Sequence, residues 1–74
     1  MTLFELMDNA IIQGDVRVSV WKGDDEVKVI EVKATDDLTL EKKVRKVEDL
    51  DIRYMFASPV DGMLHIELEL PEEV

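Results

Sequence analysis

The sequence predicts an α+β fold: an N-terminal helix packed on a roughly four-stranded antiparallel sheet of two hairpins, with a short second helix between them. Three observations predict it. Apolar residues with helical spacing open the chain, four later segments alternate between apolar and polar residues, and turn residues separate the strands of each pair. With 74 residues, 46% of them hydrophobic, residues 1–74 are expected to form a single folded domain.

The first 14 residues predict a helix. Thr2 and Glu5 have the S/T-x-x-E spacing of a capping box, in which each side chain bonds to the other residue's backbone N–H. Four apolar residues then recur at i, i+3, i+4 and i+7: Leu3, Leu6, Met7 and Ala10. Gly14 is expected to end the helix in a left-handed conformation. The apolar stripe predicts that this helix lies flat on the sheet.

The next segment, DVRVSVWKG, predicts a strand with one buried face, because its valines alternate with polar residues and a tryptophan. GDDE then turns the chain, and residues 27–34 return as the second strand of a hairpin. The alternation changes phase in this strand, since Val27 and Val29 share one parity whereas Ile30 and Val32 share the other. We therefore predict a bulge or sharp twist near Val29–Ile30; the alternative is that both faces of the strand are partly covered.

The segment EKKVRKVEDLD, residues 41–51, concentrates positive charge in a chain of net charge -9. Leu40, Val44 and Val47 have helical spacing, which predicts a short amphipathic helix, although a strand is an open alternative. Four basic residues occupy its charged face: Lys42, Lys43, Arg45 and Lys46. A nucleic-acid contact is the competing interpretation. The acidic residues on both sides and the absence of an aromatic residue within the cluster favour a solvated helix face.

The last third of the chain predicts a second hairpin. The apolar set of its first strand is Leu50, Ile52, Tyr54 and Phe56, which alternates with Asp51, Arg53 and Met55. The segment SPVDG has turn chemistry. The returning strand places Leu64, Ile66, Leu68 and Leu70 on one face and Met63, His65, Glu67 and Glu69 on the other. Pro71 is expected to end that strand.

The sequence predicts no enzyme, no catalytic residue and no cofactor. There is no cysteine, which excludes disulfides and thiolate metal sites. His65 is expected to point outward and to be exposed, and nothing in the sequence places Ser19 or Ser58 beside it as a nucleophile would require. His65, Glu67 and Glu69 share a strand face, but alternate residues lie roughly 6.6 Å apart, too far to converge on one ion. No metal site is therefore expected.

The predicted functional residues lie on the uncovered side of the sheet. Trp21, Met55 and Met63 have the parity opposite to the core residues of their strands, and a tryptophan with two methionines is typical of a contact patch. The alternative is that loops or the second helix cover them. We expect a non-catalytic protein-interaction module that binds a protein partner or forms a homo-oligomer, through this face or through a sheet edge. No nucleic acid, membrane or small-molecule substrate is expected, because the negative charge repels phosphate and no apolar run reaches about 20 residues.

A second functional hypothesis follows from the acidic composition. After residue 47 there are eight carboxylates against one basic residue, Arg53, a net charge of seven negative. Such a chain could imitate a nucleic acid and block a basic cleft of a host protein, provided that its carboxylates form one strip. The N-terminus has no basic leader typical of a signal peptide, and the lack of cysteine suits a reducing compartment, so a cytoplasmic location is expected.

The layout resembles short uncharacterised proteins of phages and prophages of Gram-positive bacteria. The similarity rests on an LFELMD-like helix, a DVRVSV-like strand, a return strand, a charged middle segment and a DGMLHIEL-like final strand. It covers most of the chain but leaves out the tryptophan and the lysine-rich middle. The resemblance implies a phage or prophage origin, and it supplies no catalytic residues to transfer.

Overall fold

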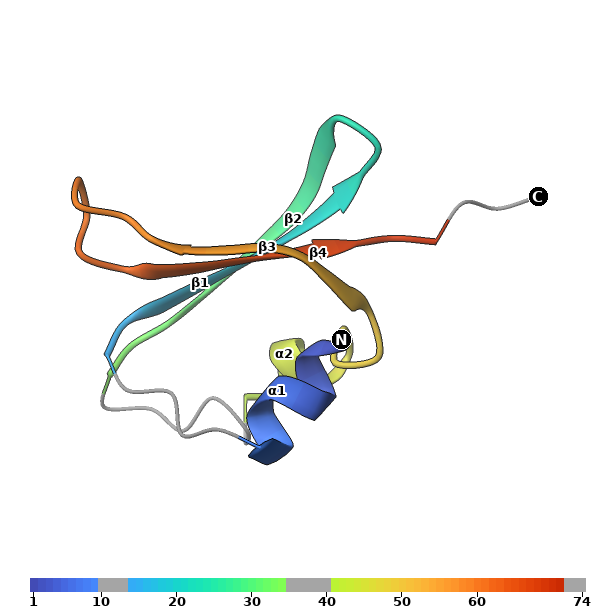
Figure 1. Cartoon of the computed structure of the whole chain (residues 1–74), viewed down its shortest axis with the longest axis horizontal. Helices are drawn as coiled ribbons and strands as arrows, with labels where there is room; N and C mark the ends of the chain where they lie inside the picture. The colour runs from blue at the N-terminus through green and yellow to red at the C-terminus, as the bar shows by residue number, and fades with distance from the viewer. Residues whose placement is uncertain (10–13, 35–40, 72–74) are drawn as a thin grey trace.

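The computed structural model describes residues 1–9, 14–34 and 41–71. Its elements in chain order are α1 (Leu3–Asn9), β1 (Val16–Lys22), β2 (Asp25–Val32), α2 (Lys42–Arg45), β3 (Asp51–Ala57) and β4 (Leu64–Glu69). Figure 1 shows both helices on one side of the four strands. We call the side of the sheet toward the helices the inner face and the opposite side the outer face. The predicted α+β architecture, with an N-terminal helix and a short second helix, is confirmed.

The sheet is mixed, so the predicted antiparallel arrangement is wrong in one pairing. The strand order is β2-β1-β4-β3. Both hairpins are antiparallel as predicted, but β4 lies between β3 and β1 and pairs with β1 in parallel. The two central strands have the most regular aliphatic alternation, whereas charged residues are more frequent in β2. Burial therefore favours β1 and β4 at the centre, and the long connection through α2 allows the crossover that this order needs.

The hydrophobic core lies between the inner face and the two helices. Val18 pairs with Ile66 across the central parallel strands, so the aliphatic sets of β1 and β4 point to the same side. The buried hydrophobic residues are Leu3, Val16, Val18, Val20, Ile30, Val32, Val44, Ile66 and Leu68. Each helix contributes one fully buried side chain, Leu3 from α1 and Val44 from α2. The parity of the strands thus predicted most of the core.

The predicted capping box begins α1. The Thr2 backbone N–H donates to Glu5 Oε1 at 3.2 Å, and the Glu5 N–H donates to Thr2 Oγ1 at 3.2 Å. Two hydrogen bonds to the Glu5 carboxylate lower its pKa: the larger effect comes from the Thr2 backbone N–H and the smaller from the Thr2 hydroxyl. Helix α1 ends at Asn9; the predicted apolar position 10 lies outside the described residues, and Gly14 has φ +96°.

We expect Thr2→Ala to lower the free energy of unfolding by about 1 kcal/mol, because an N-terminal N–H of α1 loses its acceptor. Urea denaturation followed by circular dichroism measures this. Lys42→Ala, at an exposed position of α2, serves as the control and should change stability by less than about 0.5 kcal/mol. Equal effects of the two substitutions would show that the capping box contributes nothing.

The basic segment forms one helical turn, α2, and the alternative of a strand there is wrong. Glu41 is the N-cap and accepts from the Lys43 backbone N–H. Val44 is fully buried and Val47 packs against the core, as the helical spacing predicted, whereas position 40 lies outside the described residues. The four basic side chains of the cluster are all exposed.

The predicted bulge of the first hairpin occurs two residues earlier than expected. Val20 pairs with Lys28 and Trp21 with Glu26, which leaves Val27 as the extra residue. Beyond this bulge Ile30 is buried on the inner face, and Val29 lies opposite Ser19 on the outer face. The change of phase in the sequence therefore does mark a bulge, displaced toward the turn.

Candidate protein-interaction surface

A second bulge, at Arg53 in β3, changes which residues of this strand face outward. Ile52 pairs with Leu68 and Tyr54 with Glu67, so Arg53 is the extra residue. One extra residue shifts the alternation by one position. As a result Tyr54 and the following Phe56 lie on the outer face rather than in the core. The prediction of both aromatic residues as core residues is wrong.

The three residues predicted as an interface do not form one patch. Trp21 lies on the outer face, at the end of β1 that pairs with Glu69 of β4. Met63 precedes β4 at its opposite end, six residues from Glu69, or roughly 20 Å along a strand. Met55 pairs with the buried Ile66, so it lies on the inner face, and its predicted outward position is wrong because of the Arg53 bulge. Trp21 and Met63 are half-buried, whereas Met55 is 47% exposed.

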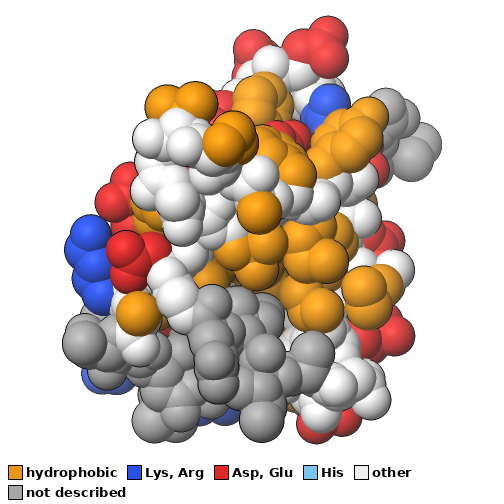
Figure 2. Space-filling model, turned by 60° about the vertical axis from the view of Figure 1, so that its left-hand side comes forward, with side chains coloured by type: hydrophobic (Ala, Val, Ile, Leu, Met, Phe, Trp, Pro, Cys, Tyr) orange, Lys and Arg blue, Asp and Glu red, His pale blue; other side chains and the backbone are white. Residues whose placement is uncertain are grey.

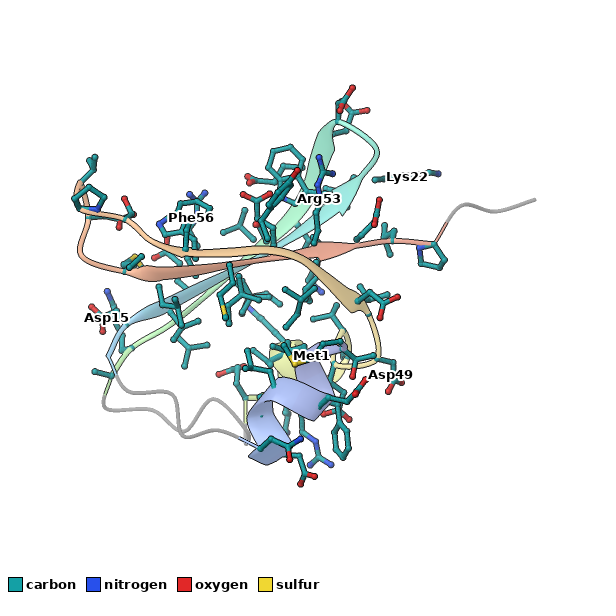
Figure 3. The ribbon with its side chains drawn as sticks, in the orientation of Figure 1. Met1, Asp15, Lys22, Asp49, Arg53 and Phe56 are labelled. Carbon is teal, nitrogen blue, oxygen red and sulfur yellow. The ribbon has the colours of Figure 1, made fainter. Side chains whose placement is uncertain are left out.

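Trp21 helps to cover the outer face. Its indole N–H donates to Ser19 Oγ at 3.1 Å, and Ser19 is only 5% exposed. The guanidinium carbon of Arg53 lies 5.4 Å from the centre of the Trp21 ring and 5.6 Å from that of Tyr54. Arg53 also donates to the backbone carbonyl of Gly23. Figure 3 shows Arg53 on the side of the sheet opposite to the helices. The bulge thus places a cation between two aromatic rings.

Among the described residues, the longest run of consecutive large, exposed apolar side chains is in β3, an edge strand. Tyr54, Met55 and Phe56 are consecutive and are 60%, 47% and 45% exposed. Tyr54 and Phe56 flank the edge on the outer face, and Met55 flanks it on the inner face. We call these three residues the β3 edge surface. Figure 2 shows that hydrophobic side chains gather over the middle of one face of the molecule. A signal for this surface existed in the sequence, since residues 54–57 are four successive uncharged residues of a strand, but regular alternation assigned half of them to the core.

The other sheet edge, β2, differs in its charges. Its charged residues are Asp25, Glu26, Lys28 and Glu31, and the Val27 bulge interrupts its pairing with β1. Charged side chains and bulges are the devices by which edge strands avoid pairing with other chains. Residues 54–57 of β3 have neither device, which distinguishes this edge as the candidate contact site.

His65 is more covered than the sequence predicted, with a side chain only 14% exposed. Its ring stacks on Phe56, with ring centres 4.9 Å apart, and its Nε2 lies 2.8 Å from Asp61 Oδ2. The Ser58 hydroxyl instead accepts from the Val60 backbone N–H at 3.3 Å. A serine nucleophile needs its hydroxyl hydrogen-bonded directly to the histidine that acts as its base. Here Ser58 bonds to the backbone of the turn and His65 bonds to Asp61, so these contacts lie within the turn region of the β3–β4 hairpin.

We expect the Asp61 carboxylate to make the hairpin sensitive to acid. The pKa of Asp61 is lowered below its ordinary value, mainly by the hydrogen bond from the Met63 backbone N–H and to a smaller extent by the hydrogen bond with the His65 side chain. A carboxyl with a lowered folded-state pKa stabilises the fold above its unfolded pKa, and this stabilisation is lost as the pH falls through the folded value. The midpoint temperature of thermal unfolding should therefore decrease when the pH is lowered below roughly 4. Asp61→Asn should flatten this dependence, whereas Asp8→Asn should not; identical acid profiles for both variants and the parent would contradict the prediction.

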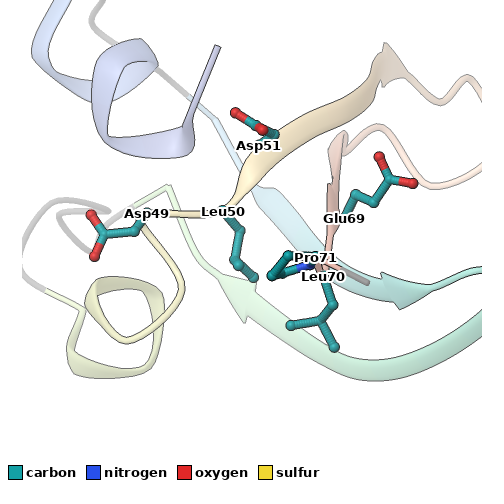
Figure 4. Close-up of a pocket in the computed structure, with 6 residues that line it drawn as sticks. All are labelled: Asp49, Leu50, Asp51, Glu69, Leu70 and Pro71. Atoms are coloured by element: carbon teal, nitrogen blue, oxygen red, sulfur yellow. The ribbon is translucent and has the colours of Figure 1, made fainter. Parts of the chain in front are cut away.

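A shallow hollow of about 370 Å³ lies where β3 begins and β4 ends. Its lining residues are Asp49, Leu50, Asp51, Glu69, Leu70 and Pro71. Figure 4 shows the apolar side chains at its centre, whereas the three carboxylates point in different directions. Among the described residues no group of three or more potential ligands is placed to hold a metal ion.

The acidic residues that the structure describes after residue 47 do not form the single strip that the nucleic-acid-mimic hypothesis requires. Asp51 pairs with Glu69 at one end of the second hairpin, whereas Asp61 lies in the turn at the other end. Glu67 lies on the outer face beside Tyr54, and Glu48 lines a separate hollow with Phe4 and Arg45 on the helical side. Glu72 and Glu73 lie outside the described residues. The described carboxylates after residue 47 are thus spread over several faces.

Comparisons with known proteins add no relative: no family model, no curated protein and no solved structure matches this chain. Among the described residues no helix has the length and apolar character needed to cross a membrane.

Proposed function

We propose that this chain is a small non-catalytic protein-interaction module of the cytoplasm, which binds itself or a protein partner through the β3 edge surface. The observation that carries the proposal is the run of three consecutive large apolar residues, each about half exposed, on an edge strand. Aromatic residues and methionine are enriched at protein interfaces. Trp21 supports this surface through Arg53 rather than forming its centre.

The energetics favour a protein as the ligand. Fully burying one such side chain contributes about 1.5–3 kcal/mol, so covering the exposed halves of three gives a few kcal/mol to a complex. The net charge of -9 opposes binding to nucleic acid or to an anionic membrane surface. A protein strand, by contrast, can also bond to the backbone of the edge.

A phage or prophage origin is part of the proposal. It is supported by the similarity of the LFELMD, DVRVSV and DGMLHIEL segments to the corresponding segments of short phage proteins. Genes for phage structural or lysogeny proteins beside the gene for this chain would support it, and a neighbourhood of housekeeping genes alone would contradict it.

Affinity capture with matched variants tests the proposed function. The tagged chain, a Tyr54→Ser variant and a Phe56→Ser variant are used to capture proteins from extracts of the organism that encodes the chain. Val60→Ser is the control, because Val60 is 94% exposed in the β3–β4 turn and undergoes a similar loss of apolar surface. We expect a captured protein that both β3 variants lose and the control retains, and that the purified components reproduce. Capture that is the same for all four proteins, or none at all together with no self-association, would contradict the proposal.

A further inference from the structure

We propose that the β3 edge is an interface between two copies of this chain, which pair antiparallel along β3 around a two-fold axis through Met55. This inference rests on the proposed function and specifies its partner. The two four-stranded sheets would then form one continuous sheet of eight strands. Four observations support it: the direction of the backbone groups, the bounds of the open segment, the side chains that meet, and the charges.

The backbone of Met55 faces the open edge. Leu64 and Leu70 of the β4 segment donate their N–H groups to Asp15 and Trp21 at 3.0 and 2.8 Å, on the β1 side. Alternate residues of a strand point their N–H and C=O groups to the same side, so Ile66 also faces β1. Its antiparallel partner Met55 consequently directs its N–H and C=O away from β4. The same reasoning applies to Ala57, the partner of Leu64.

The open segment is short and has defined ends. At its start, Thr2 forms a bridge with Asp51, and the Ile52 N–H donates to the carbonyl of Met1 at 2.7 Å, so the N-terminus covers the edge there. At its end, Ser58 begins the turn and donates to the carbonyl of Met63 at 3.0 Å. Residues 53–57 remain, with the Arg53 bulge at their start; Met55 is their midpoint and directs both backbone groups to the open edge. A two-fold axis at Met55 is therefore the arrangement that pairs the whole open segment with itself.

This register brings compatible groups together. Met55 faces Met55 of the second copy, and each donates its N–H to the carbonyl of the other, because both groups point outward. Tyr54 faces Phe56 of the second copy on the outer face, and the symmetry repeats this pair. Aromatic cross-strand pairs are among the most stabilising in sheets. The two Met55 side chains meet on the inner face and extend the apolar surface beside the core.

The charges of the open segment are compatible with self-pairing. Arg53 is its single charged residue, and in this register it faces Ala57 of the second copy. No like charges are therefore opposed within the five paired positions. The net charge of -9 on each copy does oppose association at long range, and salt screens this repulsion. Since five residues per strand make a small interface, the dimer is expected to be reversible and to strengthen as salt is added.

Sedimentation of the purified full-length chain tests the proposal. Over a roughly hundredfold range of concentration, we expect the mass to rise from that of a monomer toward twice that value, and to rise further with salt. Met55→Glu and Met55→Lys each place two like charges at the axis, so each variant alone should remain monomeric. An equimolar mixture of the two should recover the dimer, because a carboxylate of one variant then faces an ammonium group of the other across the axis. Val60→Glu, with the same change in charge as Met55→Glu, should dimerise like the parent.

Several results would overturn the self-pairing. These are a parent chain that is monomeric at every concentration, a dimer that survives Met55→Glu, a mixture that stays monomeric, or a dimer that salt weakens. Circular dichroism of each variant shows whether it is folded. A monomeric parent that still captures another protein in a Tyr54- and Phe56-dependent manner would reject the second copy as partner and leave the proposed function standing. Failure of both experiments would reject both.

Discussion

Replacing Ile66 by alanine is expected to lower the free energy of unfolding by about 3 kcal/mol, the largest effect among the substitutions considered. Ile66 is fully buried at the centre of β4, where it pairs with Val18 on one side and Met55 on the other. The alanine leaves a cavity that neighbouring strands on both sides prevent from closing. A domain of this length is stabilised by roughly 4–11 kcal/mol in total, so the variant loses a large share of its stability.

Urea denaturation of Ile66→Ala, followed by circular dichroism, measures this loss. Val60→Ala is the matched control, because Val60 is 94% exposed and should change stability by no more than about 0.5 kcal/mol. A loss below about 1 kcal/mol for Ile66→Ala would show that β4 is not a central strand, since a terminal or edge position allows the cavity to collapse.

Trp21→Ala is expected to lower the free energy of unfolding by about 2 kcal/mol, although Trp21 lies on the outer face. The substitution removes the ring beneath Arg53 and leaves the Ser19 hydroxyl without its indole donor. Trp21→Phe retains a ring but loses the N–H, so it should cost about 1 kcal/mol. Thermal and urea unfolding of both variants measure these differences.

The control for this series is Tyr54→Ala, on the other side of the Arg53 side chain. Tyr54 is 60% exposed, and its loss should cost less than the loss of Trp21. If Trp21→Ala left stability unchanged but abolished association, Trp21 would be a contact residue, as the sequence predicted, and its structural role would be rejected.

The sequence predicted element types better than it predicted neighbours. The Thr2–Glu5 capping box, both hairpins and most buried aliphatic residues followed from spacing, because periods of 3.6 and 2.0 residues report directly on local structure. The parallel pairing of β1 with β4 did not follow. Periodicity indicates which face of a strand is buried, and it contains no information on which strands lie side by side. That order depends on how the two hairpins share one core.

The candidate surface was predicted only in part, because one residue changed the parity of β3. Ile52, Tyr54 and Phe56 continue an apolar alternation in the sequence, so Arg53 does not look like an insertion. Its role depends on contacts with Trp21 and Gly23, which are distant in sequence. Tyrosine and phenylalanine suit either face of a sheet, and their side chains therefore gave no warning of the shift.

Amide hydrogen exchange of the monomer, measured by NMR at low protein concentration, shows directly whether β3 is an open edge flanked by apolar side chains. The amides of Met55 and Ala57 should exchange rapidly, because their N–H groups point away from β4, whereas that of Phe56 should be protected because it points toward β4. Protection of Met55 as strong as that of Phe56 in the monomer would show that the edge is already covered, and would contradict the account.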